Sequence, residues 1–154
     1  MLKVYKLPMA TPQARGRPMV NLLPLKPNES IATMMPLPDD EEIWDKMHVM
    51  FATSHGDVRL NALREFTNIK SNWKIDMKLD DSEGAELIDV KTCREGQDIL
   101  LAVTNGKCIR FPITGVREFA SRSSTGVRGI RRTAKDRVVS MSILEHQEID
   151  IDQR

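Results

Sequence analysis

Residues 100–111 of this 154-residue chain read LLAVTNGKCIRF, an apolar run followed by a short polar turn and a second run with apolar positions. Asn105 and Gly106 carry the strongest signal, because both central residues of a type I′ turn need a positive φ, which asparagine and glycine tolerate. The stretch therefore predicts two antiparallel strands joined by a tight hairpin turn. Cys108 falls inside the second strand, where a buried, inert thiol is the usual outcome.

The same pattern occurs about fifty residues earlier, since residues 49–60 read VMFATSHGDVRL. The similarity continues with LREF at 63–66 and VREF at 116–119. Each copy then has a polar stretch and an alternating segment, 74–79 or 127–131, typical of a half-buried strand. A truncated copy without its first hairpin opens the chain. A period of about 50 residues with about four short strands and no convincing helix is typical of propeller blades.

We therefore expect an all-β protein made of propeller-like blades of four antiparallel strands, arranged as an open, partial arc. Such an arc leaves strand edges unpaired, which favours self-association. The expected parts are the C-terminal part of a first blade (1–38), an acidic connector (39–48), a second blade (49–93), a third blade (94–144) and a tail towards a missing fourth blade (145–154).

The net charge of +1 conceals a strong segregation of charge along the chain. Residues 1–38 hold five basic and one acidic side chain, and residues 104–137 hold nine basic and two acidic ones. Residues 39–103 hold eight basic and fifteen acidic side chains. The two basic blocks are candidate surfaces for a polyanion, although a charge run can also be a solvated face.

Other chemistry is sparse in this sequence. No apolar run approaches the roughly 20 residues that span a bilayer, and the first residues lack a secretory signal, so a cytoplasmic protein without a membrane partner is expected. Zinc needs about four ligands, and scattered histidines with two unpaired cysteines predict no metal site. No phosphate-cradling loop is present, and Tyr5, the only tyrosine, fits a packing role. We therefore expect no catalytic site.

Two motifs point to a known family. ARGRPMVNLLPL at 14–25 resembles the end of the first blade in the C-terminal region of the bacterial DNA gyrase A subunit, and SSTGVRGI at 123–130 resembles the corresponding part of its third blade. The resemblance extends over essentially the whole chain. It implies a β-pinwheel, a six-bladed relative of the propeller, whose basic rim bends and wraps DNA. The family's glycine-rich basic box lies upstream of this chain, which resembles a fragment of the longer protein.

The resemblance also implies partners. They are double-stranded DNA, the rest of the gyrase A subunit, which is much longer, and, in the whole enzyme, the gyrase B subunit in an A2B2 heterotetramer associated with the bacterial nucleoid. That enzyme is a type IIA topoisomerase, which uses ATP to introduce negative supercoils. It needs ATP and magnesium outside this chain, so no cofactor is expected here. The tyrosine that cleaves DNA belongs to a separate domain of the family, and Tyr5 does not match it.

A protein that bends DNA needs cationic groups at repeated intervals on one surface. In the repeat, such groups occupy the polar stretch and the strand after it, so matching positions in consecutive blades would line one rim. Gly16, Gly126 and Gly129 would let the backbone approach DNA closely. Three more basic residues lie in an apparent turn and are therefore weaker candidates for DNA contact, namely Arg132, Lys135 and Arg137. Arg117 fits a structural role. The candidate DNA-binding residues are Arg15, Arg17, Lys70, Lys74, Lys78, Arg122, Arg128 and Arg131.

Three alternatives remain open at this point. A protein-interaction propeller module would expose apolar patches in place of aligned cations. An enzyme in its own right would need convergent titratable residues. The equivalent region of topoisomerase IV is the nearest competitor of the gyrase hypothesis, and the VNLLPL stretch at 20–25 favours gyrase.

Overall fold

The chain divides into two compact units, Met1–Ile31 and Ala32–Arg154. In the first unit, the described residues form two 3-10 helices, η1 (Val4–Lys6) and η2 (Met19–Asn21), and no strand. The second unit holds all of the described strands. The structure is a computed structural model that describes residues 4–23, 25, 27, 30–67, 79, 84–120 and 124–148.

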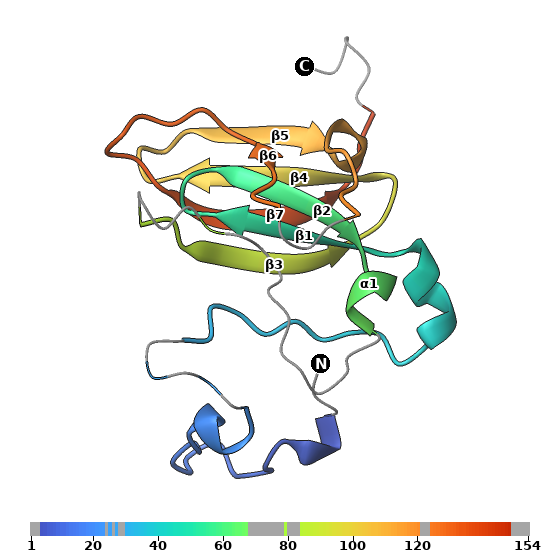
Figure 1. The fold of residues 1–154 in the computed structure, drawn as a ribbon, viewed down its shortest axis with the longest axis vertical. Helices are drawn as coiled ribbons and strands as arrows, with labels where there is room; N and C mark the ends of the chain where they lie inside the picture. Colours follow the sequence, from blue (N-terminus) through green and yellow to red (C-terminus); the bar gives the residue numbers. More distant parts are fainter. Residues whose placement is uncertain are drawn as a thin grey trace. The chain divides into compact units, whose positions relative to one another are not determined.

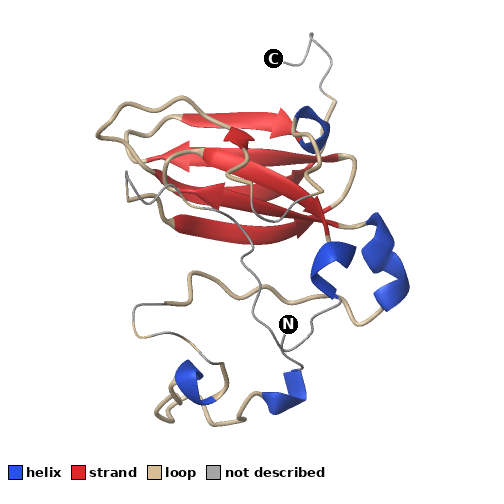
Figure 2. Ribbon diagram, viewed as in Figure 1, coloured by secondary structure: helices blue, strands red, loops and turns tan. Residues whose placement is uncertain are grey.

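The second unit consists of two antiparallel β-sheets packed face to face (Figures 1 and 2). The expected all-β class with antiparallel sheets is confirmed. The first sheet has the strand order β3 (Leu87–Cys93), β1 (His48–Thr53), β2 (Asp57–Ala62) and β6 (Val127–Arg128). The second has the order β5 (Cys108–Pro112), β4 (Gln97–Val103) and β7 (Val138–Glu145).

Both predicted hairpins are present. Met50 lies opposite Leu60 in the β1–β2 pair, and Leu100 lies opposite Arg110 in the β4–β5 pair. The type I′ turn expected at Asn105 is wrong, because no described residue other than glycine has a positive φ. The third residue of each turn, Gly56 or Gly106, has a φ above 80°, as in a type I turn followed by a glycine bulge.

The fourth strand of the first sheet comes from the segment predicted to belong to the third blade. Val127 pairs with Val58, and Arg128 pairs with Asp57, so β6 lies along the free edge of β2. The predicted range 94–144 thus contributes a strand to the sheet built by residues 48–93. The blade boundaries themselves stay predictions.

Two glycines allow β6 to lie this close to β2. A Cβ on Gly126, whose φ is 90°, would overlap the carbonyl oxygen of Val58. A Cβ on Gly129 would lie 2.9 Å from Leu101 Cδ1 and 3.0 Å from Val58 Cγ1. The close approach that these two glycines allow is to neighbouring strands. An approach of their backbone to DNA stays a prediction.

Apolar side chains of β1 alternate between two cores. Met50 and Ala52 face the second sheet, whereas Val49 and Phe51 face the opposite side, because successive side chains of a strand point to opposite faces. The second side is covered by η3 (Glu41–Lys46), which places the buried Trp44 there and begins at an N-cap, where the side chain of Asp40 accepts a hydrogen bond. The core between the sheets consists mainly of Met50, Val58, Leu60, Ile99, Leu101, Val103, Ile113, Ile130, Val138 and Met141.

One of the two cysteines differs from the sequence expectation. Cys108, expected to be buried, is exposed, because no described strand pairs with the outer edge of β5. Cys93 is buried, and burial raises the pKa of its thiol to about 12. Its Sγ lies 3.7 Å from the carbonyl oxygen of His48. At neutral pH this thiol stays protonated and inert.

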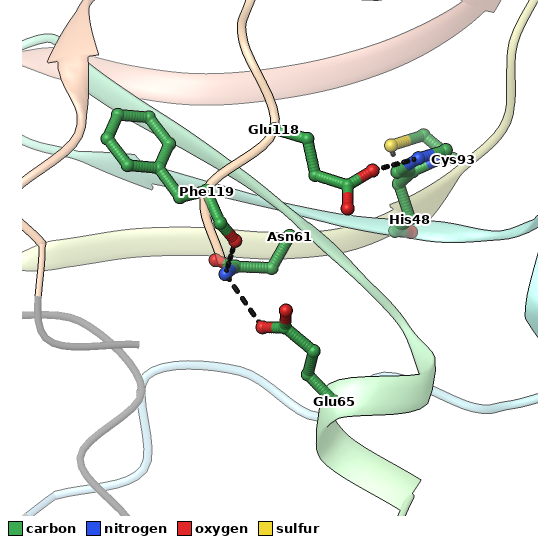
Figure 3. A network of polar contacts seen from close by, with 6 residues as sticks. All are labelled: His48, Asn61, Glu65, Cys93, Glu118 and Phe119. Atoms are coloured by element: carbon green, nitrogen blue, oxygen red, sulfur yellow. Dashed lines mark hydrogen bonds and ion pairs between the residues drawn. The ribbon is translucent and has the colours of Figure 1, made fainter. Parts of the chain in front are cut away.

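A polar network fastens the segment after β5 to the first sheet (Figure 3). His48 Nε2 lies 2.9 Å from Glu118 Oε2. The fully buried Asn61 donates from Nδ2 to the carbonyl oxygen of Phe119 at 2.5 Å and to Glu65 Oε2 at 3.0 Å. The two related sequence stretches fold differently. Residues 64–66 of LREF lie in α1 (Arg64–Thr67), whereas VREF follows η5 (Ile113–Gly115) and its Glu118 pairs with Leu60 of β2.

Candidate nucleic-acid interface

The hairpin turns of both sheets lie at the same end of the second unit, and the loop between β6 and β7 runs along them (Figure 1). Gly129 N donates to the carbonyl oxygen of Gly56 at 2.8 Å, and Thr104 N donates to that of Arg137 at 2.9 Å. The loop thereby contacts the turns of two consecutive sheets. We call residues 54–56, 104–107 and 128–137 the turn edge.

A basic hollow of 620 Å³ lies in the turn edge. Its charged side chains are four arginines, whose guanidinium groups are cationic. Three of them are exposed to solvent, whereas Arg132 is half-buried. Four guanidinium groups around one hollow create a strongly positive surface that suits a phosphate-bearing ligand. The hollow is lined by His55, Arg128, Ile130, Arg131, Arg132, Ala134 and Arg137.

The pairing of β6 places the first two arginines. Val127 packs against the core between the sheets, so its neighbour Arg128 points to solvent. Ile130 is buried and Arg131 is exposed. No hydrogen bond or ion pair joins the side chain of Arg128, Arg131 or Arg137 to any residue that the structure describes. These three guanidinium groups are therefore available to a ligand.

Other cations of the basic block 104–137 serve the fold. Arg110 Nη2 lies 2.6 Å from Asp98 Oδ2, and His146 Nδ1 lies 2.8 Å from Asp98 Oδ1. Burial by itself would raise the pKa of Asp98, but the hydrogen bonds from His146 and Arg110 outweigh it and lower this pKa. Arg117 lies over the ring of Phe119, 4.4 Å from its centre, in a cation–π contact within the fold. Arg110 and Arg117 are therefore occupied within the fold.

The structure unites only part of the predicted set of DNA-binding residues. Arg128 and Arg131 line the same hollow, together with Arg132 and Arg137, which sequence reasoning placed second. Arg15 and Arg17 are exposed on the first unit and stay predictions. His55 was missed, although its position in the turn that precedes β2 repeats the position of Asn105. Four predicted residues lie outside the described ones, namely Lys70, Lys74, Lys78 and Arg122.

Among the described residues, no group of three or more His, Cys, Asp or Glu side chains is placed to hold a metal ion. Tyr5 is 81% exposed, so the packing role expected for it is wrong.

In the described part of the chain, no helix has the length and apolar character required to cross a membrane.

Comparisons with known proteins agree with this fold. A family model described as the DNA gyrase C-terminal domain, beta-propeller, matches residues 1–38 and 97–145. The DNA gyrase A subunit of Rickettsia bellii is 49% identical over 94% of this chain, and that of Escherichia coli is 41% identical over 92% of it. The chain spans only 16% of the length of these relatives.

Solved structures show the same fold at lower sequence identity. The C-terminal domain of DNA topoisomerase IV superimposes with a TM-score of 0.76 at 22% identity, over 93% of this chain and 43% of that one. The DNA gyrase A C-terminal domain superimposes with a TM-score of 0.67 at 17% identity, over 84% and 41%.

Proposed function

Because this chain belongs to the DNA gyrase C-terminal domain family, we propose that it binds double-stranded DNA through the turn edge and bends it there. The observation that carries the proposal is the basic hollow, in which four arginines from β6 and the following loop converge. Duplex DNA carries one negative charge per about 1.7 Å of its axis. Guanidinium groups at neighbouring points of an edge neutralise successive phosphates and favour curvature towards the protein.

The proposed contact is to the DNA backbone and not to the bases. The described residues of the turn edge form turns and an irregular loop, without a helix that could enter the major groove. Arginine contacts to phosphate fix the position of the duplex but carry no sequence information. We therefore expect little preference among DNA sequences.

In the whole protein, this binding would serve as the wrapping step of gyrase. The proposal assigns the chain no catalytic site and no cofactor, and it places ATP hydrolysis, magnesium and DNA cleavage in other parts of the assembly. The partners would be the rest of the gyrase A subunit together with the gyrase B subunit, in an A2B2 enzyme that introduces negative supercoils, in the bacterial cytoplasm and at the nucleoid. The gyrase A relatives at 41–49% identity favour gyrase over topoisomerase IV.

One observation favours a second candidate, docking of another protein. A groove of 560 Å³ lies between residues 33–36 and the strands β3 and β7. Met34 is 70% exposed beside it, and Leu144 is 36% exposed. Exposed apolar side chains of this kind are what a protein-interaction module would present. The groove is smaller than the basic hollow and lacks its concentration of charge.

A salt series tests the proposal. We expect the chain to bind a fluorescent duplex of about 40 base pairs, with log affinity falling linearly against log salt at a slope of about −4 to −5, because about five phosphates are neutralised. A second duplex of the same length and scrambled sequence should bind within about twofold, because backbone contacts do not read bases. Fluorescence anisotropy measures both. Absence of binding at about 50 mM salt, or a slope near zero, would exclude the proposal.

A further inference from the structure

One acidic side chain, Asp136, lies in the cationic loop of the turn edge. Its carboxylate accepts hydrogen bonds from Thr133 Oγ1 at 2.5 Å and from Asn105 Nδ2 at 2.8 Å. Thr104 Oγ1 lies 3.5 Å from its other oxygen. Asp136 therefore joins its own loop to the β4–β5 turn of the second sheet.

Arg132 makes the corresponding connection to the first sheet. Its Nε donates to the carbonyl oxygen of His55 at 3.0 Å, in the β1–β2 turn. Its Nη1 donates to the carbonyl oxygens of Thr133 and Asp136 at 3.1 and 3.2 Å. These three hydrogen bonds join the guanidinium group to the backbone of the loop and of the turn.

The two side chains fix the loop between the turns of consecutive sheets. Arg137 is held further by Thr104, which donates N–H to its carbonyl oxygen at 2.9 Å and accepts from its N–H at 3.1 Å. Arg131 is the residue directly before Arg132, whose side chain is hydrogen-bonded to the β1–β2 turn. The exposed arginines at both ends of the loop are therefore presented from a backbone that is already ordered, which lowers the entropy lost on binding.

We propose that Arg132 and Asp136 are positioning residues for the DNA contact, and the proposal rests on the function proposed above. In this account, Asp136 strengthens DNA binding although its negative charge repels phosphate. Holding Arg131 and Arg137 in place outweighs that repulsion. Arg132 likewise acts through the loop that it organises and not as one more phosphate contact.

Asp136→Asn tests whether Asp136 strengthens or weakens DNA binding. Charge alone predicts tighter DNA binding, because a negative charge is removed from the binding edge. Positioning predicts weaker binding, because the hydrogen bonds that Thr133 and Asn105 both donate to Oδ2 lose the strength that a charged carboxylate gives them. If one phosphate contact is lost, affinity falls about eightfold at 0.1 M salt and the salt slope becomes shallower by about 0.9.

Arg132→Lys gives an independent test at constant charge. Lysine keeps the positive charge but cannot reproduce the three backbone hydrogen bonds described above, which leave from two nitrogens of one planar group. We expect Arg132→Lys to lower the DNA affinity and to make the salt slope shallower by about as much as Asp136→Asn does. Unchanged affinity in this variant would overturn the proposed role of Arg132.

The matched control is Asp57→Asn. Asp57 lies opposite Arg128 in the β2–β6 pair, and its carboxylate makes no hydrogen bond or ion pair with any described residue. Removing this charge is expected to leave DNA affinity unchanged or to raise it. Asp136→Asn removes a negative charge within the turn edge and Asp57→Asn removes one beside it, opposite Arg128. An opposite response of the two variants therefore isolates the positioning effect.

The outcomes separate the two proposals. If the unaltered chain binds no DNA, the proposed function fails. If it binds and Asp136→Asn binds equally well or better, the positioning role fails. A fall in affinity at an unchanged salt slope would reflect fewer folded molecules and would also overturn the positioning role. Thermal unfolding by circular dichroism, recorded for each variant, gives the folded fraction at the temperature of the titration.

Discussion

Replacing Arg128, Arg131 and Arg137 together by alanine is expected to weaken binding to a duplex of about 40 base pairs roughly 500-fold at 0.1 M salt. Affinity varies with the molar salt concentration to the power of about −0.9 per neutralised phosphate. At 0.1 M salt, each lost contact therefore lowers the affinity about eightfold. The salt slope should become shallower by about 2.7 for the same reason. Fluorescence anisotropy across a salt series measures both quantities.

The controls for this experiment lie at the opposite end of the sheets. Arg94 is in the β3–β4 turn, and Lys46 precedes β1, whose first residue His48 pairs with Cys93. Both side chains are exposed, and Arg94 forms a surface ion pair with Glu145 at 3.0 Å, which contributes little to stability. Arg94→Ala and Lys46→Ala should bind DNA as the unaltered chain does. An equal loss in these controls would mean that overall charge, and not the turn edge, determines binding.

Gly126→Ala is expected to destabilise the second unit by about 3 kcal/mol. The residue has a φ of 90°, which a side chain rarely tolerates, and the new methyl group would overlap the Val58 carbonyl oxygen of β2. β6 would then have to move away from the edge of β2. For a chain of this size, the loss corresponds to a fall of about 6–12 °C in the unfolding midpoint, measurable by circular dichroism.

Gly115→Ala is the matched control for this substitution. No atom lies within 4 Å of the position of its Cβ, and its φ is not in the positive range. We expect a change of no more than about 0.5 kcal/mol, as for most surface substitutions. If the two alanine variants unfolded at the same temperature, β6 would not depend on close contact at Gly126.

Local patterns were sufficient to predict the hairpins and the fold class. The apolar runs of β1 and β4 and the turns that contain Gly56 and Gly106 recur about fifty residues apart, and both are local features of the sequence. The partner of β6 could not be predicted in the same way. Alternation at 127–131 indicates a strand, but it does not tell which sheet edge accepts that strand, because this depends on contacts about seventy residues away along the chain. The exposure of Cys108 has the same origin, since it follows from the position of β5 at a sheet edge.

The candidate site was predictable only in part. Arg128 and Arg131 followed from alternation in the strand and its continuation, and the structure places both at one hollow. Arg132 and Arg137 are weaker candidates from the sequence alone, because they fall in an apparent turn. The high density of cations between 104 and 137 was the signal that could have included them. The role of Asp136 gave no sequence signal, since its partners Asn105 and Thr104 are about thirty residues away.

The central claim, that the turn edge is the surface that contacts DNA, is tested most directly by nuclear magnetic resonance. A short duplex would be titrated into the 15N-labelled chain while backbone amide and arginine Nε–Hε resonances are followed. The account predicts the largest shifts at residues 128–137 and 104–107, and little change at Arg94. Largest shifts at the groove beside β3 and β7, with the turn edge unchanged, would contradict it.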